Sequence, residues 1–379
     1  MVKTALSVIS TLARTGPTNV LHGIVTNYDP QRYRAIVVTL SPEPEQSRLK
    51  EFRNMGIEVR QMGMSRLRSM LDGKKQLAAL IEKLRPSVIH THGARADVLA
   101  SSIIQAQGRV LSTVHADLRA DYLMGYGFLR GTMLARQHIA ALRRSIQAIA
   151  VSPTVADALA RDNIQANVVL NGIDIEKFKP LPSREDVRKL RADLGWPEDS
   201  VIFLHTGALI PRKRPVTVIE SFISANLSQT AHLFFAGDGP LRQECEIAAH
   251  NRQDIHFLGP RDDIPKLLQA SDALVSASVS EGLPMALIEG ASTGVRILAS
   301  NIYAHQLVRD LFPEQVRLFS LNDNSSLADS FQQFSLPTSE TFKGITQPNP
   351  NGLRQVSAKT MSSLYQDHYD RLLTLYRHV

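Results

Sequence analysis

The segment SDALVSASVSEGLPMALIEGASTGVRILAS, residues 271–300, contains two short apolar runs, 273–277 and 294–299, on either side of a helical stretch. Gly282, Leu283 and Pro284 turn the chain after the first run, and proline suits the first helical position because its missing N–H is not needed there. Short apolar strands that alternate with helices are typical of a parallel sheet covered on both faces. The segment therefore predicts one strand–helix–strand unit of such a sheet.

Apolar runs of the same kind occur along both halves of the chain. In the first half they are 4–10, 35–40, 57–61, 87–91, 109–114, 147–151 and 166–170. The series starts again at 200–206, 231–236 and 254–258, before the two runs already described. We therefore predict an α/β protein with two Rossmann-like, doubly wound domains that face each other across a cleft. Ligands of such sheets bind beyond the carboxyl ends of the strands, so residues that follow strands are the candidates for function.

The length of 379 residues fits two domains. The charged and proline-containing stretch 171–199 separates the two series, so we expect domains of residues 1–178 and 179–357. We expect 321–357 to be irregular and 358–379 to form an amphipathic helix. The single cysteine, Cys245, excludes a disulfide framework and a cysteine-based zinc site, and no apolar run is long enough for a transmembrane helix.

The net charge of +7 is unevenly distributed. Residues 1–178 carry 23 Lys and Arg against 14 Asp and Glu, and residues 179–379 carry 20 against 22. Segments 66–85 and 128–147 hold the excess, with a net charge of +4 each. In the second segment an apolar stripe of Phe128, Ile139, Leu142 and Ile146 stands beside Arg130, Arg136, Arg143 and Arg144. Such a helix can lie on an anionic membrane, or it can be a core helix with a solvated basic face.

Two motifs at strand ends indicate an anion site in the second domain. Glu281 and Glu289 flank a helix start, whose free N–H groups attract phosphate, and both carboxylates can accept hydrogen bonds from sugar hydroxyls. The alternative is that Glu281 caps the helix and Glu289 is solvated. Lys213 follows the strand that ends at Gly207, and with its neighbours Arg212 and Arg214 it suits a diphosphate. The alternative for this basic cluster is a solvated turn.

Three further strand ends give weaker indications of ligand binding. The turn 237–240, GDGP, is explained by turn chemistry as well as by a ligand. Gly16 follows the first strand without a full dinucleotide fingerprint, yet it could let a phosphate approach the backbone. His115 and, with less positional support, His92 follow strands of the first domain, where the cleft is expected.

Taken together, the motifs resemble those of the retaining glycosyltransferases of the GT-B fold, glycosyltransferase family four. The resemblance covers nearly the whole chain and rests on Thr15-Gly16-Pro17, VIHTHG at 88–93, TVH at 113–115, NGID-x-x-x-F at 171–178, G-x-L-x-x-x-K at 207–213, GDGP at 237–240 and EGLP…E at 281–289. It implies that the C-terminal helix crosses back to complete the first domain. That domain would hold the acceptor, and the second would hold a nucleotide-sugar donor.

The resemblance also implies roles for individual residues. Glu289 would hold the ribose, Glu281 the donor hexose, and Lys213 the diphosphate. His115 would lie near the transferred sugar, and His115, Glu281 and Lys213 are the expected catalytic residues. The remaining donor-binding residues would be Gly16, Gly207, Arg212, Arg261, Gly282, Leu283, Pro284 and Leu287. One position departs from the family, because Ala208 stands where an arginine usually follows the glycine.

We therefore expect a retaining hexosyltransferase that acts on a glycan or a lipid-diphosphate-linked acceptor, in cell-surface polysaccharide or glycolipid synthesis. The expected donor is linked to UDP rather than GDP, no cofactor or metal is expected since no convincing D-x-D motif is present, and nucleic acid is not an expected partner. The expected location is the cytoplasm, with peripheral attachment to the inner face of the membrane. The alternatives are an epimerase or soluble disaccharide synthase of the same fold, and a non-catalytic nucleotide-sugar-binding protein, which Ala208 makes plausible.

Overall fold

The computed structural model describes residues 2–103, 106, 108–227, 231–323, 325–335 and 347–375. The chain divides into two compact units. Unit 1 contains Met1–Gly172 and Gln355–Val379, and unit 2 contains Ile173–Arg354. The division thus follows Gly172, a few residues before the boundary expected at 178. Residues 376–379 of the expected C-terminal helix lie outside the described part of the chain.

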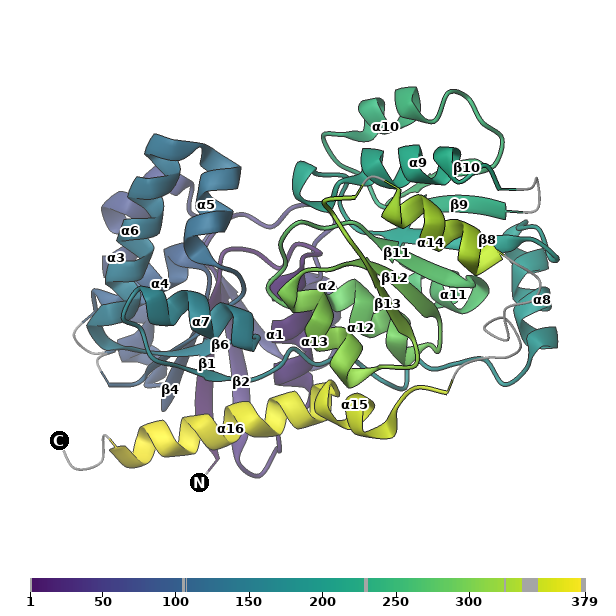
Figure 1. The fold of residues 1–379 in the computed structure, drawn as a ribbon. Helices are drawn as coiled ribbons and strands as arrows, with labels where there is room; N and C mark the ends of the chain where they lie inside the picture. Colours follow the sequence, from purple (N-terminus) through teal and green to yellow (C-terminus); the bar gives the residue numbers. More distant parts are fainter. Residues whose placement is uncertain are drawn as a thin grey trace. The chain divides into compact units, whose positions relative to one another are not determined.

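Unit 1 is built on a parallel sheet with the strand order β3-β2-β1-β4-β5-β6-β7. Its strands are β1 (Lys3–Ile9), β2 (Tyr33–Thr39), β3 (Glu58–Gln61), β4 (Val88–His92), β5 (Val110–Val114), β6 (Ile146–Ala150) and β7 (Ala166–Val168). Its helices are α1 (Gly16–Thr26), α2 (Leu49–Asn54), α3 (Arg66–Leu84), α4 (Ala94–Ser101), α5 (Leu118–Tyr126), α6 (Phe128–Ser145), α7 (Pro153–Arg161) and α16 (Ala358–Leu375), and they flank the sheet in Figure 1. Successive residues Ala5 and Leu6 of β1 enter different hydrophobic clusters, so both faces of the strand are buried.

Unit 2 repeats this plan with the strand order β10-β9-β8-β11-β12-β13. Its strands are β8 (Val201–Thr206), β9 (Ala231–Ala236), β10 (Ile255–Gly259), β11 (Ala273–Ser276), β12 (Arg296–Ser300) and β13 (Val316–Phe319). The accompanying helices are α8 (Arg184–Leu194), the short 3₁₀ helix η2 (Pro211–Lys213), α9 (Pro215–Ser224), α10 (Arg242–Ala248), α11 (Ile264–Ala270), α12 (Met285–Ser292), α13 (Tyr303–Leu311), α14 (Ser326–Ser335) and α15 (Pro350–Gln355). In each unit the strand order reverses beside one strand, β1 and β8 respectively, which is where open α/β sheets bind ligands.

Residues 321–357, which we wrongly expected to be irregular, contain regular structure. They contain α14 and α15, and β13 just before them was also missed. In α14 the apolar residues Leu327, Phe331 and Phe334 recur at helical spacing among polar ones and enter the core of unit 2. Phe331 packs edge-on against Phe203 of β8, with ring centroids 4.8 Å apart. Residues 324 and 336–346 of this stretch lie outside the described residues.

The apolar stripe expected for 128–147 is only partly correct. Ile139 and Leu142 of α6 are buried, but Phe128 at the helix start is 77% exposed, and Ile146 is the first residue of β6. The helix is therefore anchored by its later turns, while its first turns present apolar side chains to solvent. Among the helices of the described residues, none is long and apolar enough to cross a membrane.

Helix α16 completes the core of unit 1. Met361, Tyr365 and Tyr369 recur every four residues and pack, fully buried, against β1, β4, β5 and α1. Polar contacts fix the same helix at its rim, where Arg32 donates to Asp367 at 2.9 Å and Asp370 at 2.7 Å. Figure 1 shows α16, in yellow, running along unit 1. The chain thus returns to unit 1 to cover one face of its sheet.

Gly172, the last residue of the first segment of unit 1, lies directly against the residues that precede α16. A Cβ atom at this position would stand 2.5 Å from the Ser357 carbonyl oxygen and 2.7 Å from the Ala358 Cα. Neither backbone atom can move without displacing α16, so glycine is required by close approach.

We predict that Gly172→Ala lowers the free energy of unfolding of unit 1 by about 1–3 kcal/mol, because overpacking against backbone costs this much. Urea unfolding followed by tyrosine fluorescence checks this value. Gly125→Ala is the matched control: it adds a methyl group in α5 where no atom of the described residues lies within 4 Å, and it should leave stability unchanged or slightly raised. Equal stability of the two variants would contradict the role given to Gly172.

Candidate active site

The carboxyl ends of β8 and β11 bring the second-domain candidates together. β8 is followed by Gly207 and the loop to η2, and β11 is followed by the loop 277–284 that leads into α12. Since β8 and β11 are neighbours in the sheet, the two loops leave it side by side. The backbone N–H of Val279 donates to the Arg212 carbonyl oxygen at 2.9 Å and joins the loops directly.

Glu281 is the centre of this arrangement. Its Oε2 accepts from Arg212 Nη1 at 2.7 Å, and its Oε1 accepts from Ser278 Oγ at 2.9 Å. Lys213 Nζ lies 3.7 Å from Oε1. Burial alone would raise the pKa of the Glu281 carboxyl, but the charges of Lys213 and Arg212 and the Ser278 hydrogen bond lower it overall. Glu281 is therefore ionised at neutral pH.

These contacts decide between the alternatives for Glu281. Within the described part of the chain no side chain caps the start of α12, so Glu281 is not the helix cap. Pro284 occupies the N-cap position of α12, one residue before the helical position that we expected for it. Gly282, Leu283, Pro284 and Leu287 are buried.

Lys213 is placed by a close approach to Gly207. A Cβ atom on Gly207 would stand 2.9 Å from Lys213 Nζ, and the φ of Gly207 is +122°. A side chain at Gly207 would therefore be strained and would displace the ammonium group. Gly237 in the GDGP turn packs against the same loop, since its Cβ atom would lie 2.0 Å from the Gly207 carbonyl oxygen. The structure thus gives this turn a packing role, which supports the reading from turn chemistry.

Glu289 lies one to two turns into α12, and the pKa of its carboxyl group differs from that of an ordinary glutamate. Burial raises its pKa to about 7, although the charges of Lys177 and Lys213 act in the opposite direction. Glu281 is held by direct contacts with cations, whereas Lys177 and Lys213 reach Glu289 only through their charge. With a pKa near neutral pH, the carboxyl can accept a hydrogen bond from a ligand hydroxyl when ionised and donate one to it when protonated.

The other second-domain candidates lie further from this cluster. Arg261 follows β10, two positions from β8 in the sheet, and its guanidinium is bound to Asp263 at 2.8 and 2.6 Å. Ala208 is exposed beside Gly207, and Arg212, which could have replaced the missing arginine, is turned toward Glu281. Arg214 is exposed in the left-handed conformation at the start of α9.

Gly16 and His115 belong to unit 1, at the carboxyl ends of β1 and β5. Gly16 is exposed at the start of α1, where an added Cβ would meet no atom of the described residues within 4 Å. His115 Nε2 lies 3.4 Å from His92 Nδ1. Burial lowers the pKa of His115 to about 4, so the imidazole is neutral at pH 7 and can exchange hydrogen bonds with a hydroxyl.

Sequence reasoning named His92 beside His115 but missed the residues behind these side chains. The rings of His90 and His92 have centroids 4.2 Å apart, and His90 is held by Tyr369 and Thr113, each at 2.7 Å. In unit 2, His205 of β8 is buried, and burial lowers its pKa to about 3. The HTH spacing of 90–92 was visible in the sequence, but its tyrosine partner is 279 residues away. Among the described residues, no group of three or more His, Cys, Asp and Glu is arranged to hold a metal ion.

Comparison with known proteins places both halves of the chain in one group. Residues 14–177 match the family described as Glycosyltransferase Family 4, and residues 186–334 match Glycosyl transferases group 1. The UDP-Gal:alpha-D-GlcNAc-diphosphoundecaprenol alpha-1,3-galactosyltransferase of Escherichia coli is 28% identical over 270 residues, which are 67% of each chain. The chain spans between 36% and 67% of the length of the first curated relatives that it matches.

Two solved structures show the fold. Anabaena HepE in complex with UDP-glucose superimposes with a TM-score of 0.79 at 18% identity, over 97% of this chain and 100% of that one. Sucrose-phosphate synthase from Thermosynechococcus elongatus gives a TM-score of 0.81 at 17% identity, over 98% and 100%. Both likenesses cover nearly the whole chain, so the predicted GT-B fold is confirmed.

We predict that Glu289 makes the stability of unit 2 depend on pH. Below pH 4.5 the carboxyl is protonated in the folded and the unfolded chain alike; between pH 4.5 and about 7 only the folded chain keeps the proton, so stability falls as pH rises through this window. Glu289→Gln imitates the protonated form and should raise the free energy of unfolding at pH 8 by about 3 kcal/mol. Thermal unfolding at pH 5 and pH 8 checks this.

The control is Glu220→Gln, which changes an exposed glutamate of α9 and should alter stability little at either pH. If Glu289→Gln is no more stable than the wild type at pH 8, the pKa of the Glu289 carboxyl is not raised in the folded chain.

Proposed function

Because the chain belongs to glycosyltransferase family four, matched in both of its halves, we propose that it is a retaining, metal-independent hexosyltransferase. Its donor is a UDP-sugar and its acceptor is a glycan or a lipid-diphosphate-linked sugar, in the synthesis of a cell-surface polysaccharide or glycolipid. The observation that carries the proposal is the pairing of two cations, Lys213 and Arg212, with Glu281 beside the uncapped start of α12.

The charges of this cluster suit the departure of a diphosphate. When the sugar–diphosphate bond breaks, negative charge develops on the leaving phosphate and positive charge on the anomeric carbon. Lys213, Arg212 and the backbone N–H groups at the start of α12 would stabilise the phosphate. Glu281 would then accept hydrogen bonds from hexose hydroxyls, while Glu289, further along α12, would hold the ribose.

Retention is what membership of the family implies, and two of the proposed site residues are poor candidates for a covalent intermediate. Glu281 is already bound to Arg212 and Ser278, and a carboxylate so engaged is a weak nucleophile. His115 is neutral, so it suits a hydrogen bond to a sugar hydroxyl better than a covalent intermediate. We therefore propose same-face attack by the acceptor, assisted by the leaving phosphate, with Lys213 in place of a metal ion.

The names of related proteins support the choice of substrates. The Escherichia coli relative is named for UDP-Gal and for an acceptor on diphosphoundecaprenol, and HepE was solved with UDP-glucose. A second relative, from Campylobacter jejuni, also carries an undecaprenol diphosphate acceptor in its name. We extend to this chain the substrate class that these names share, a UDP-sugar and a lipid-diphosphate-linked acceptor.

We predict that Lys213→Ala lowers turnover more than 100-fold, about 2.7 kcal/mol of transition-state stabilisation, since the leaving diphosphate loses one of its two proposed cations. The measurement is transfer from a panel of UDP-sugars in the presence of EDTA, with the anomeric configuration of the product read by NMR. The wild-type protein should remain active with EDTA and retain the donor configuration. Lys266→Ala, which removes an exposed lysine of α11, is the control with unchanged turnover.

Near-normal turnover of Lys213→Ala would remove Lys213 from the mechanism. A product of inverted configuration would contradict retention. Loss of activity in EDTA would contradict metal independence. Donor binding with neither hydrolysis nor transfer would favour the non-catalytic alternative that Ala208 raised.

A membrane-binding surface on unit 1 would suit a lipid-linked acceptor, and the lengths of two helices favour one. Helix α3 has 19 residues and α6 has 18, about 27–29 Å each, whereas the strands that follow them, β4 and β6, have five residues, about 17 Å. Each helix ends just before a strand begins, so its first turns extend past the carboxyl ends of the strands. The exposed apolar residues gather on these turns: Leu67, Met70, Leu71, Phe128, Leu129 and Met133.

The basic residues around these turns favour an anionic lipid surface. Arg130 and Arg136 of α6 are exposed, as are Arg68, Lys74 and Lys75 of α3. Arg144 is exposed as well, but it lies in the last turn of α6, about 24 Å along the helix from Phe128. Arg143 has a structural role, because its Nε donates to the Asp162 carbonyl oxygen at 2.9 Å. We propose that the apolar first turns of α3 and α6 enter the membrane interface while Arg130 and Arg136 meet lipid phosphates.

We predict that the wild-type protein floats with liposomes containing anionic lipid, and that Phe128→Ser/Leu129→Ser lowers the bound fraction at least tenfold, because two exposed apolar side chains are lost. Flotation with and without anionic lipid is the measurement. Ile247→Ser, at an exposed apolar residue of unit 2, is the control with unchanged binding. Absence of binding to either kind of liposome would rule out the membrane surface.

A further inference from the structure

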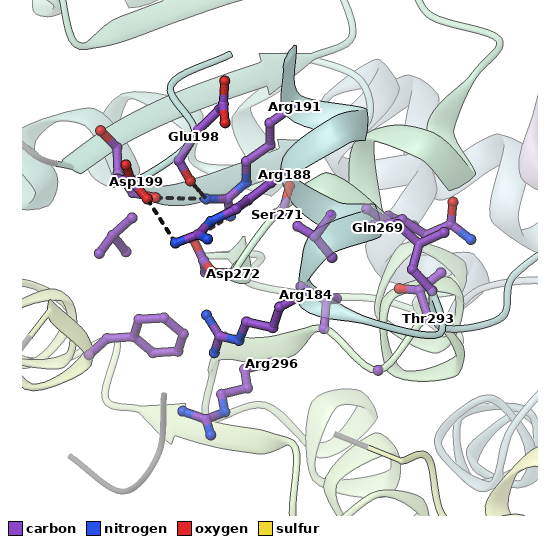
Figure 2. A pocket seen from close by; sticks show the side chains of 18 residues that line it. Arg184, Arg188, Arg191, Glu198, Asp199, Gln269, Ser271, Asp272, Thr293 and Arg296 are labelled. Atoms are coloured by element: carbon purple, nitrogen blue, oxygen red, sulfur yellow. Dashed lines mark hydrogen bonds and ion pairs between the residues drawn. The ribbon is translucent and has the colours of Figure 1, made fainter. Parts of the chain in front are cut away.

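Strand β11 leads into the loop of Glu281, and its own start is anchored at the amino ends of the strands, the part of unit 2 drawn in Figure 2. Asp272 directly precedes β11, and its Oδ2 accepts from Arg191 Nη2 at 2.7 Å and from the Ile202 N–H at 2.8 Å. In the sheet, β11 lies between β8 and β12. Because the strand is fixed in this way, the position of Glu281 depends on what holds the residues after its carboxyl end.

The loop after β11 is held from both neighbouring strands. On the β8 side, Arg212 Nη1 donates to the Ser280 carbonyl oxygen at 2.8 Å as well as to Glu281. On the β12 side, Ser300 Oγ donates to the Ser278 carbonyl oxygen at 2.5 Å. Ser300 is the last residue of β12 and is fully buried. A cation on one side and a buried hydroxyl on the other therefore hold the loop between them.

The contact of Ser300 extends to Glu281 through Ser278. Ser278 is fully buried, and its own hydroxyl donates to Glu281 Oε1 at 2.9 Å. Burial acts to raise the pKa of the Glu281 carboxyl, and this hydrogen bond assists the charges of Lys213 and Arg212 in lowering it. Two hydrogen bonds thus connect the end of β12 to the direction and the charge of the carboxylate.

His305 of α13 holds Ser300 in turn. Its Nδ1 lies 2.8 Å from the Ser300 carbonyl oxygen, and because a carbonyl oxygen only accepts, Nδ1 carries the hydrogen. The ring is fully buried, and burial lowers its pKa to about 4, so it is neutral at pH 7. Helix α13 therefore fixes the end of β12 behind the loop of Glu281.

We propose that Ser300 is a positioning residue for Glu281, acting through Ser278 on recognition of the donor hexose. The role rests on the proposed function, in which Glu281 holds the hexose and Glu289 holds the ribose. Without the Ser300 hydroxyl, the buried Ser278 carbonyl group loses a donor, and the loop backbone must shift to replace it. Glu289 lies beyond the loop, on α12, so the binding of the nucleotide should depend on Ser300 much less than the binding of the hexose.

The test is isothermal titration of the full chain with UDP and with a panel of UDP-hexoses, of which the one that the wild type binds most tightly is used for the variants. Ser300→Ala should weaken binding of this UDP-hexose about fivefold or more, and that of UDP by less than about twofold, since a hydrogen bond to the hexose is misplaced. Ser292→Ala is the matched control with unchanged binding of both ligands. It shortens another buried serine of unit 2, whose hydroxyl has no hydrogen-bond partner among the described residues.

A double-mutant cycle distinguishes positioning through Ser278 from a general loss of structure. Ser278→Ala removes the hydrogen bond to Glu281 and should itself weaken binding of the UDP-hexose. If Ser300 acts through that bond, adding Ser300→Ala should weaken binding by less than about a further twofold. Independent losses that multiply in the double variant would overturn the positioning role, and so would equal losses for UDP and the UDP-hexose in Ser300→Ala.

The wild type separates this role from the proposed function. A wild-type protein that binds no UDP-hexose would overturn the proposed function and, with it, the role of Ser300. A wild type that binds a UDP-hexose no better than Ser300→Ala does would overturn the role of Ser300 alone.

Discussion

The ion cluster of Glu281 with Arg212 and Lys213 is the interaction on which the proposed donor site of unit 2 depends. It ties the loop after β8 to the loop after β11 and keeps a carboxylate charged where burial alone would neutralise it. Burying a carboxylate beside two cations costs less free energy than burying it without them, so each member of the cluster holds the others in position. The same charges that stabilise the loops are the ones that a diphosphate and a sugar would use. Preorganisation of this kind lowers the reorganisation needed when charge develops.

Unit 1 is organised around buried hydrogen bonds that reach across the whole chain. Tyr369 of α16 contacts His90 at 2.7 Å and Tyr28 at 3.0 Å, and Tyr365 contacts Thr113 at 2.8 Å. His90 stacks against His92, which lies beside His115. The orientation of a predicted catalytic histidine is therefore connected, through buried polar groups, to a helix that follows unit 2 in the sequence.

Most of the fold could be predicted because each strand is a short apolar run bounded by turn residues, and the expected and observed strands agree within about two residues. Lys213 and Glu281 could be named for the same reason, since they follow strands that are neighbours in the sheet. The contact of Arg212 with Glu281 could not be predicted, because the direction of the arginine side chain depends on a residue 69 positions away. Helix α14 was missed because its four apolar anchors are interspersed with Ser, Gln and Asp.

The return of the chain to unit 1 has a consequence for biosynthesis. Unit 2 is one continuous stretch, so it can fold as soon as it leaves the ribosome. Unit 1 is made first but lacks α16, and until residues 358–375 emerge, Ala5, Ile24, Val88 and Leu111 have one face open to water. The earlier-made unit thus completes its folding last. During that interval it is the part of the nascent protein that most needs protection by chaperones.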